Sequence, residues 1–378
     1  MTARMPAFFL AALLCSVPVS AGTDGWRAQA AQADALARSN LFEDAAAAYT
    51  VAADLCDAAH ASNSTDGAHL ALSAAQLHYY LGNYAHAEPL FTRAATAFHD
   101  CLGPLHPDTA RTLHLLGSAQ YCRGHFAQAS STLMAALAAK EAAFGPDHPE
   151  TARTLNNLAV LYDAQQQHAT ALVFYERALQ VKQRALGADN PDLAHELNNL
   201  AIAYASLGRY DDALPHARRA LALREASRGP DAPETAQSLS TLAELLQHQR
   251  MTNEAAAAFQ RALDIRARYF GTQHLEVAHS CAALARLCAA TGQFDPARAL
   301  LQRAYAIRTL MLGARHPSAA ETLADLARTE GACGSWTAAV AYATRALTAF
   351  ESATDTAGGE LFARALRADQ RALCALLL

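Results

Sequence analysis

The chain has 378 residues, of which 52% are hydrophobic and 17% are charged, and its formal net charge is −5. This charge gives no electrostatic support for a nucleic-acid partner, while the length and the apolar fraction allow a large buried core. Alanine is far more abundant than glycine, a balance that favours helix.

Residues 1–21 form the first element along the chain, a predicted export signal. Arg4 gives it a positive start, and the apolar stretch AFFLAALLCSVPVSA ends in small residues, as a cleavage site requires. Pro18 interrupts this stretch, which is too short to span a bilayer. No later segment is long and apolar enough to do so. We therefore expect an exported chain, periplasmic or secreted, without a stable membrane span.

From residue 22 to residue 350 the sequence is built on a period of 42 residues. A fixed period of this size is typical of stacked repeats, each too small to bury its apolar face alone. The step is marked by loops of the form Gly-x-x-x-Pro, which lie at 103–107, 145–149, 187–191, 229–233 and 313–317.

Each period is predicted to form two helices, as the fourth one illustrates. Pro149 suits the first turn of a helix, where its missing N–H has no partner to lose. Leu155, Leu158 and Tyr162 then follow at spacings that place them on one stripe. Gly187 ends the second helix, because glycine tolerates the left-handed conformation beyond a helix end.

This pattern resembles the tetratricopeptide repeat. The residues that match the family signature are Leu158-Ala159, Tyr162, Ala171, Tyr175 and Ala178. The repeat length of 42 residues and the motif LNNLA-x-x-Y followed by G-x-x-H-P are similar to those of the longer repeat subtype found in kinesin light chains. The resemblance covers roughly residues 26–350 and implies an all-α fold, a right-handed α-solenoid of about eight antiparallel helix pairs.

Residues 351–378 have no partner helix in this scheme. Their apolar residues, from Leu361 to Ala368, suit an amphipathic helix. We expect a C-terminal capping helix that covers the end of the stack, as terminal caps do in such arrays.

The resemblance also implies a peptide-binding groove, lined by the first helix of each pair. In the family, asparagines on this helix grip the main chain of an extended peptide, and an amide offers the donors and the acceptor that this needs. An arginine fork there could pair with a carboxylate of the ligand. The candidate groove residues are Arg111, His114, Tyr121, Arg153, Asn156, Asn157, Asp163, His195, Asn198 and Asn199.

The asparagines have a second interpretation. They could form an amide ladder that joins the first helices of neighbouring repeats. Both interpretations stay open at this stage, and both could hold.

His-Pro pairs precede three helices, at 106–107, 148–149 and 316–317. Stacking separates them by about 10 Å or more, too far for shared metal coordination at about 2 Å. We interpret these histidines as capping and turn residues and expect no metal site.

Two cysteine pairs, Cys56 with Cys101 and Cys288 with Cys333, are 45 residues apart. A disulfide within either pair is conceivable in an oxidising compartment. However, packed helix axes are about 8–10 Å apart, so we expect reduced thiols.

No nucleophile elbow, phosphate-binding glycine loop or zinc-protease motif is present. We therefore predict a non-catalytic scaffold, without a cofactor, that binds a peptide or protein segment. An enzyme or enzyme subunit with an unrecognised active site, and a purely structural spacer, are the alternatives.

Overall fold

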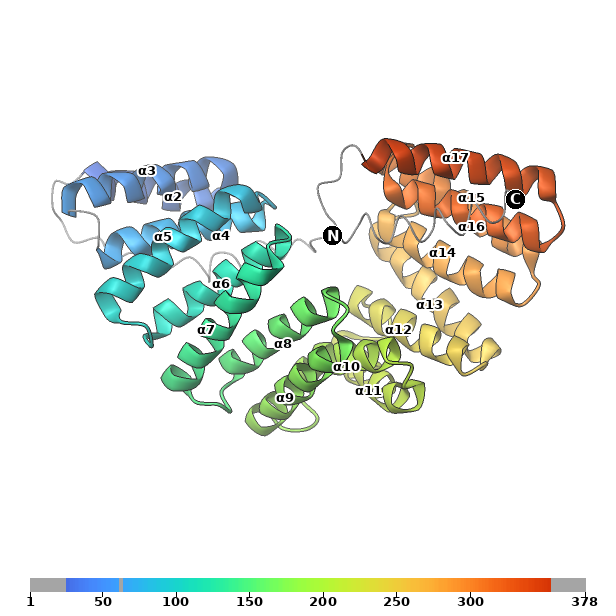
Figure 1. The fold of residues 1–378 in the computed structure, drawn as a ribbon, viewed down its shortest axis with the longest axis horizontal. Coiled ribbons are helices and arrows are strands. Elements are labelled where there is room, and N and C mark those ends of the chain that lie inside the picture. Colours follow the sequence, from blue (N-terminus) through green and yellow to red (C-terminus); the bar gives the residue numbers. More distant parts are fainter. Residues whose placement is uncertain (1–24, 61–63, 355–378) are drawn as a thin grey trace. The chain divides into compact units, whose positions relative to one another are not determined.

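The computed structural model describes residues 25–60 and 64–354 (Figure 1). This part of the chain contains α-helices and one short 3-10 helix, η1, and has no β-strand, in agreement with the predicted all-α class. The helices are α2 (Gly25–Arg38), α3 (Phe42–His60), α4 (Thr65–Tyr80), α5 (Tyr84–Leu102), α6 (Pro107–Cys122), α7 (Phe126–Phe144), α8 (Pro149–Ala164), α9 (His168–Leu186), η1 (Pro191–Leu193), α10 (Ala194–Ser206), α11 (Tyr210–Arg228), α12 (Pro233–His248), α13 (Thr252–Phe270), α14 (Leu275–Ala290), α15 (Phe294–Leu312), α16 (Pro317–Ala332) and α17 (Trp336–Thr354).

The chain divides into two compact units, residues 1–188 and residues 189–378, a division that the sequence did not predict. Unit 1 contains helices α2 to α9, and unit 2 contains η1 and helices α10 to α17. Within each unit, consecutive helices pack against one another, so each unit is a stack of four helix pairs (Figure 1). The predicted number of about eight pairs is confirmed. We call the first helix of each pair helix A and the second helix B.

The loops between pairs start and stop the helices as predicted. Helix α7 ends at Gly145, which has a φ of 96°, a conformation that glycine adopts without steric cost. Helix α8 then begins at Pro149, directly after its N-cap residue His148. His106 and His316 occupy the same N-cap position at α6 and α16, so the capping interpretation of the His-Pro pairs is confirmed.

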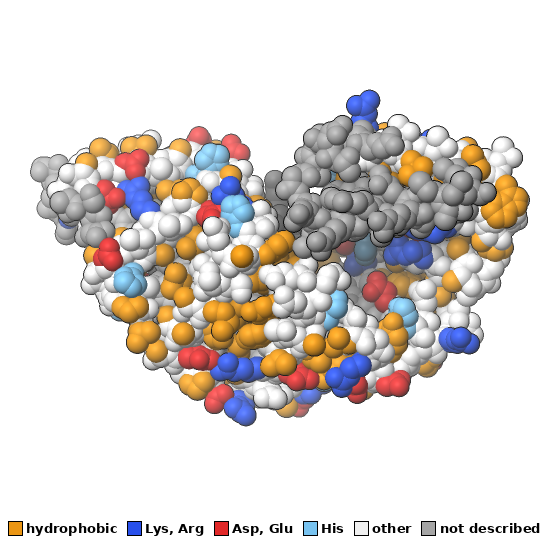
Figure 2. Space-filling view, viewed as in Figure 1, with side chains coloured by type: hydrophobic (Ala, Val, Ile, Leu, Met, Phe, Trp, Pro, Cys, Tyr) orange, Lys and Arg blue, Asp and Glu red, His pale blue; other side chains and the backbone are white. Residues whose placement is uncertain are grey.

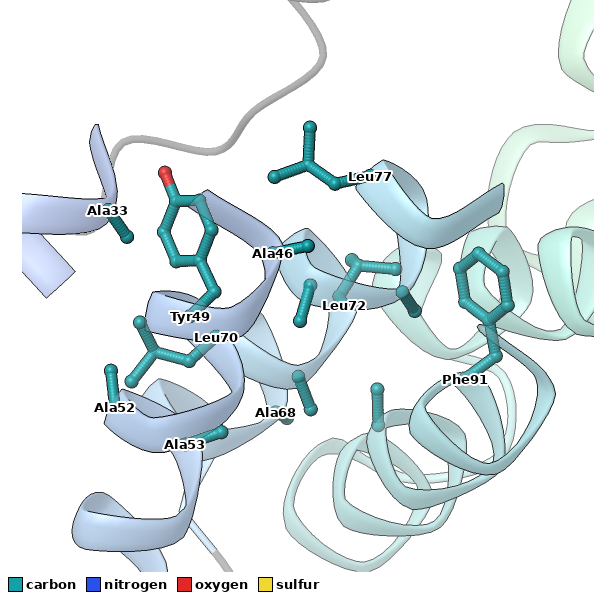
Figure 3. Packing of buried hydrophobic residues seen from close by; sticks show 14 of the residues in the cluster. Ala33, Ala46, Tyr49, Ala52, Ala53, Ala68, Leu70, Leu72, Leu77 and Phe91 are labelled. Carbon is teal, nitrogen blue, oxygen red and sulfur yellow. The ribbon is translucent and has the colours of Figure 1, made fainter. Parts of the chain in front are cut away.

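Alanine makes close packing of the helices possible. In the core of unit 1, the rings of Tyr49 and Phe91 and the side chain of Leu77 lie among alanines such as Ala46 and Ala53 (Figure 3). All five side chains are buried. Small residues let two helix backbones approach, and the large side chains fill the remaining space.

The predicted stripe of the fourth pair is confirmed as core. Leu155 and Leu158 on α8 and Tyr175 and Ala178 on α9 are buried. Tyr162 is half-buried and stacks on Phe174, with ring centroids 5.4 Å apart. The spacing that places these residues on one side of each helix therefore also identifies the side that is buried in the core.

Two predicted segments lie outside the described residues, the export signal over 1–21 and most of the capping helix over 351–378. Among the described helices, none combines the length and the apolarity that crossing a bilayer requires. Cys56 and Cys288 are reduced, so neither of the two cysteine pairs considered above is joined by a disulfide.

Candidate functional site

The A helices expose two rows of side chains, each with one residue per 42-residue step. In the first row every residue is exposed; it consists of Arg111 and Arg153 in unit 1 and His195, Gln237, His279 and Glu321 in unit 2. The second row lies two helical turns further along each helix and is exposed throughout unit 2, where it consists of Ile202, Glu244, Arg286 and Arg328. These rows lie on the face of helix A that the resemblance assigns to a ligand.

Between the two rows the same face is buried, which corrects part of the predicted groove. His114, Asn156 and Asn198 are 7%, 9% and 1% exposed. The neighbouring helix A explains the burial of His114, because its Nδ1 lies 3.1 Å from the hydroxyl oxygen of Thr154 on α8. Burial lowers the pKa of His114 well below its usual value, and the cations Lys140 and Arg153 add to this effect. These three side chains form the floor beneath the rows instead of reaching out from the surface.

Asn157 and Asn199, one position further along, are only half-buried. Asn157 Nδ2 donates to the hydroxyl of Ser118 on α6 at 2.9 Å and lies 3.5 Å from Nε2 of His114. In unit 2, Asn199 Nδ2 lies 3.2 Å from Nε2 of His195 on the same helix. Asn157 therefore joins α8 to α6 through a serine hydroxyl and not through a second amide. Contact of either asparagine with a ligand stays a prediction.

Tyr121 and Asp163 end the predicted groove in unit 1, and both are half-buried. The Tyr121 ring lies 5.9 Å from the Phe126 ring at the start of α7. Asp163 binds His168 Nδ1 at 2.6 Å at the start of α9. Both side chains thus hold the turn within their own helix pair.

Arg111 and Arg153 are the two residues of the first row in unit 1, and both are exposed cations. Arg111 lies 3.4 Å from Asp108 and stacks over the Phe144 ring, with 5.2 Å between the guanidinium carbon and the ring centroid. Arg153 lies 3.0 Å from Glu150. About half of each arginine side chain is exposed, so each guanidinium keeps donors on its accessible side.

A column of buried cations on the B helices was missed in the sequence. Lys140, Arg224 and Arg266 are buried, and Arg308 is nearly so. They occupy one register position that recurs every 42 residues. Between Lys140 and Arg224 this position is held by Lys182, which is half-buried. The signal that could have found them is this periodic basic residue, in a helix position flanked by core alanines and leucines.

Each of these cations binds the first turns of the next helix A. Lys140 donates to the main-chain carbonyl of Glu150 and to its carboxylate, both at 3.1 Å. Burial opposes ionisation of the Glu150 carboxyl, but Lys140 and Arg153 outweigh it and lower its pKa to about 2. In unit 2 Arg224 donates to the carbonyl of Glu234 at 2.7 Å. Side chain and main chain together therefore fix one repeat on the next.

Arg266 and Arg308 bring the same chemistry under the helix-A face of unit 2. Arg266 donates to Ser240 at 3.0 Å and to Ser280 at 2.6 Å, which joins α12 to α14. Arg308 donates to Thr322 on α16 at 2.8 Å. Above this floor the exposed rows carry both acidic and basic side chains, Glu244 and Glu321 as well as Arg286 and Arg328. Figure 2 likewise shows charged side chains of both signs on the face that it presents.

The second row of unit 2 ends in a charge triad. Arg286 and Arg328 lie 3.3 Å and 2.7 Å from the buried carboxylate of Asp325. Both arginine side chains remain more than two-fifths exposed. Among the described residues, no group of three or more His, Cys, Asp or Glu side chains is placed to hold a metal ion.

The comparison with protein families decides the identity of this architecture. The tetratricopeptide repeat model matches five overlapping stretches that together cover residues 68–310, namely 68–142, 131–184, 164–226, 192–267 and 234–310. The chain belongs to the tetratricopeptide repeat family. The predicted resemblance is thereby confirmed, and this repeat fold supports a protein–protein interaction scaffold with protein partners.

Several solved structures of other proteins resemble this chain. The nearly identical TPR-like repeats of a Podosopora anserina protein described as a kinesin light chain are 24% identical, with coverage of 56% of this chain and 99% of that chain and a TM-score of 0.48. BtubC (BKLC) from P. vanneervenii is 23% identical, with coverage of 61% and 91% and a TM-score of 0.51. A Rap protein complexed with Competence and Sporulation Factor is 15% identical, with coverage of 94% and 100% and a TM-score of 0.52. No curated protein matches this chain.

Proposed function

We propose that this tetratricopeptide repeat protein is an exported, non-catalytic adaptor that holds a segment of another protein on its helix-A face. The observation that carries the proposal is the exposed first row: α6 and α8 in unit 1, and separately α10, α12, α14 and α16 in unit 2, present a polar or charged side chain at one register position. Polar groups that recur at a fixed step suit an extended peptide, because its main-chain N–H and C=O groups also recur at a regular spacing. The similarly folded Rap protein was solved with a bound factor, which supports binding as a use of this fold.

Unit 1 offers the clearest chemistry for a ligand. Arg111 and Arg153 stand one repeat apart, each with part of its guanidinium accessible. Their donors suit acidic side chains or a terminal carboxylate on the bound segment. The half-buried amide of Asn157 lies next to them on the same face and offers a main-chain contact.

The test is capture of the partner by crosslinking in the native compartment. We expect Arg111→Glu with Arg153→Glu to abolish capture, because both cations become anions on the proposed face. Arg184→Glu is the matched control, since Arg184 is an exposed arginine on helix B of the same unit, paired with Asp147. Equal recovery of the partner by the double variant and the control would sink the proposal.

The asparagines require a second readout. Replacement of Asn157 and Asn199 by leucine is expected to abolish capture while helix content stays intact. Because Asn157 also joins α8 to α6, thermal unfolding must be measured in parallel. Loss of capture without loss of the folded state supports a ligand contact. A loss of stability with unchanged capture favours the spacer alternative.

Export and the absence of catalysis belong to the same proposal. Residues 1–21 have the composition of a removable signal, so the mature protein should begin near residue 22. N-terminal sequencing of the natural protein tests this, and a chain that keeps Met1 would contradict export by this route. An enzyme remains the rival hypothesis, and measured turnover that is lost on replacement of His279 or Glu244 would support it.

A further inference from the structure

Histidine side chains cap four of the A helices, two in each unit. In each case the imidazole Nδ1 accepts a hydrogen bond from the main-chain N–H two residues further on. The distances are 3.2 Å for His106 at α6, 3.1 Å for His148 at α8, 3.2 Å for His274 at α14 and 3.1 Å for His316 at α16.

This geometry requires the neutral imidazole. Nδ1 can accept only when its lone pair is available, so the ring proton must be on Nε2. A second proton would turn Nδ1 into a donor, and the cap would be lost. The same proton would also place a positive charge at the positive end of the helix dipole.

We infer that these four caps make the repeat array acid-sensitive. In acid, protonation of the four rings removes the Nδ1 acceptor and releases the first turns of α6, α8, α14 and α16. Because each ring must stay neutral to cap its helix, the stabilisation is present at neutral pH and is lost towards acid pH.

The charges around each ring modulate the effect. For His316, burial lowers the pKa, and Arg308 on α15 adds to this. His274 stacks on Phe270, with centroids 4.5 Å apart, and the nearby Glu276 is 3.3 Å from Arg266. Next to His316 the charged group is a cation, and next to His274 it is an acid that already has a cationic partner. Neither loop therefore offers a protonated imidazole much electrostatic stabilisation.

In unit 1 the acids beside the capping rings also have cationic partners. His148 stacks on Phe144, with centroids 5.1 Å apart, and its neighbour Glu150 is bound by Lys140 and Arg153. The adjacent acid Asp147 is paired with an arginine of α9. His106 has Asp108 at 3.7 Å from Nδ1, and this carboxylate lies 3.4 Å from Arg111.

The chain contains its own control at this register position. Asn190 caps η1 with its side-chain oxygen, which accepts from the N–H of Asp192 at 2.9 Å. Ala232 precedes α12 without a side-chain cap. Asparagine therefore makes the same bond as histidine, but it does not titrate, and the four histidine caps can be replaced without loss of the acceptor.

The experiment compares urea unfolding of the full chain at pH 7.5 and pH 5. In the variant His106→Asn, His148→Asn, His274→Asn and His316→Asn, we expect the midpoint at pH 7.5 to stay near that of the natural chain and its loss at pH 5 to be clearly smaller. The control variant is His86→Asn with His99→Asn, since both histidines are exposed and neither caps a helix. The inference would be overturned if the urea midpoint of the capping variant fell between pH 7.5 and pH 5 as much as that of the natural chain. It would also be overturned if the control variant reduced this fall as much as the capping variant does.

A second measurement needs no substitution. Nitrogen NMR of the natural chain at neutral pH reports which ring nitrogen of each histidine carries the proton. We expect the proton on Nε2 at the four caps, and main-chain amide exchange in the first turns of these helices to accelerate as the pH falls, beyond the intrinsic pH effect. Protons on Nδ1 at neutral pH would contradict the caps even if the variant failed to fold.

Discussion

Replacement of Glu150 by glutamine tests the contact between buried cation and helix start in unit 1. Lys140 is fully buried, and the Glu150 carboxylate, 3.1 Å away, is its charged partner. The fall of the Glu150 pKa from 4.5 to about 2 corresponds to ~3 kcal/mol of stabilisation of the ionised form, at 1.36 kcal/mol per pKa unit. Loss of one partner of a buried ion pair costs about 3–5 kcal/mol, so two independent arguments give a similar magnitude.

We expect Glu150→Gln to lower the free energy of unfolding of unit 1 by ~3 kcal/mol at neutral pH. The sign of the pH dependence follows from the lowered pKa. The contribution of Glu150 is complete above pH 4.5 and is lost as the pH falls towards about 2. In the glutamine variant, the free energy of unfolding should therefore fall less on acidification than in the natural chain. Urea unfolding between pH 3 and pH 7 measures this difference.

Asp147→Asn is the matched control, because Asp147 lies in the same loop and its ion pair with Arg184 is exposed on both sides. An exposed pair contributes about 0–1 kcal/mol, so the control should unfold almost as the natural chain does. If Glu150→Gln costs no more than this control, the buried cation is not held by the carboxylate, and the reasoning about the column is refuted.

Three further substitutions test the packing. Ala178→Trp overfills a fully buried contact and should cost roughly 1–3 kcal/mol; an unchanged melting temperature would argue against the register. Gly117→Val should cost a similar ~1–3 kcal/mol, because even a Cβ at Gly117 would lie 2.6 Å from Leu133 Cγ; chemical denaturation measures this, and a more stable variant would contradict it. Tyr49→Phe removes the hydroxyl that donates to Asp34 and should cost about 1 kcal/mol; thermal unfolding checks it, and no loss would mean that the bond has no net value.

The helix limits could be read from the sequence because local chemistry sets them. Gly145 has a positive φ at the end of one helix, and Pro149 opens the next. Both residue types act through their own backbone, independently of the rest of the fold. The same holds for His148, whose ring reaches a main-chain N–H only two residues away.

The depth of individual side chains could not be read in this way. Asn156 and Asn157 are adjacent in the sequence, but the first is buried in the floor and the second is half-buried. Consecutive residues are separated by 100° around a helix, so the periodicity assigns a face, while the neighbouring helices decide which residues on that face are covered. The prediction of Asn156 as an accessible groove residue failed for this reason.

The buried cations were missed for a related reason. A basic residue on a helix normally keeps its charge in water, and at Lys140 and Arg266 only the recurrence of the basic residue among alanines and leucines points to burial. Their partners lie 10 or 14 residues further on, on the next helix A. The step of 42 residues reveals that such positions are equivalent, but only the packed helices show that they are enclosed.

The cation column has a consequence for how the length of such a chain can change. Arg224 binds Ser238, Arg266 binds Ser280 and Arg308 binds Thr322, each 14 residues away. If one whole period were excised within unit 2, the guanidinium before the cut would meet a hydroxyl in the same place after it. A change of any other length between a cation and its hydroxyl would move the acceptor away and leave the buried charge without it, so these segments can be lost or gained only as complete modules.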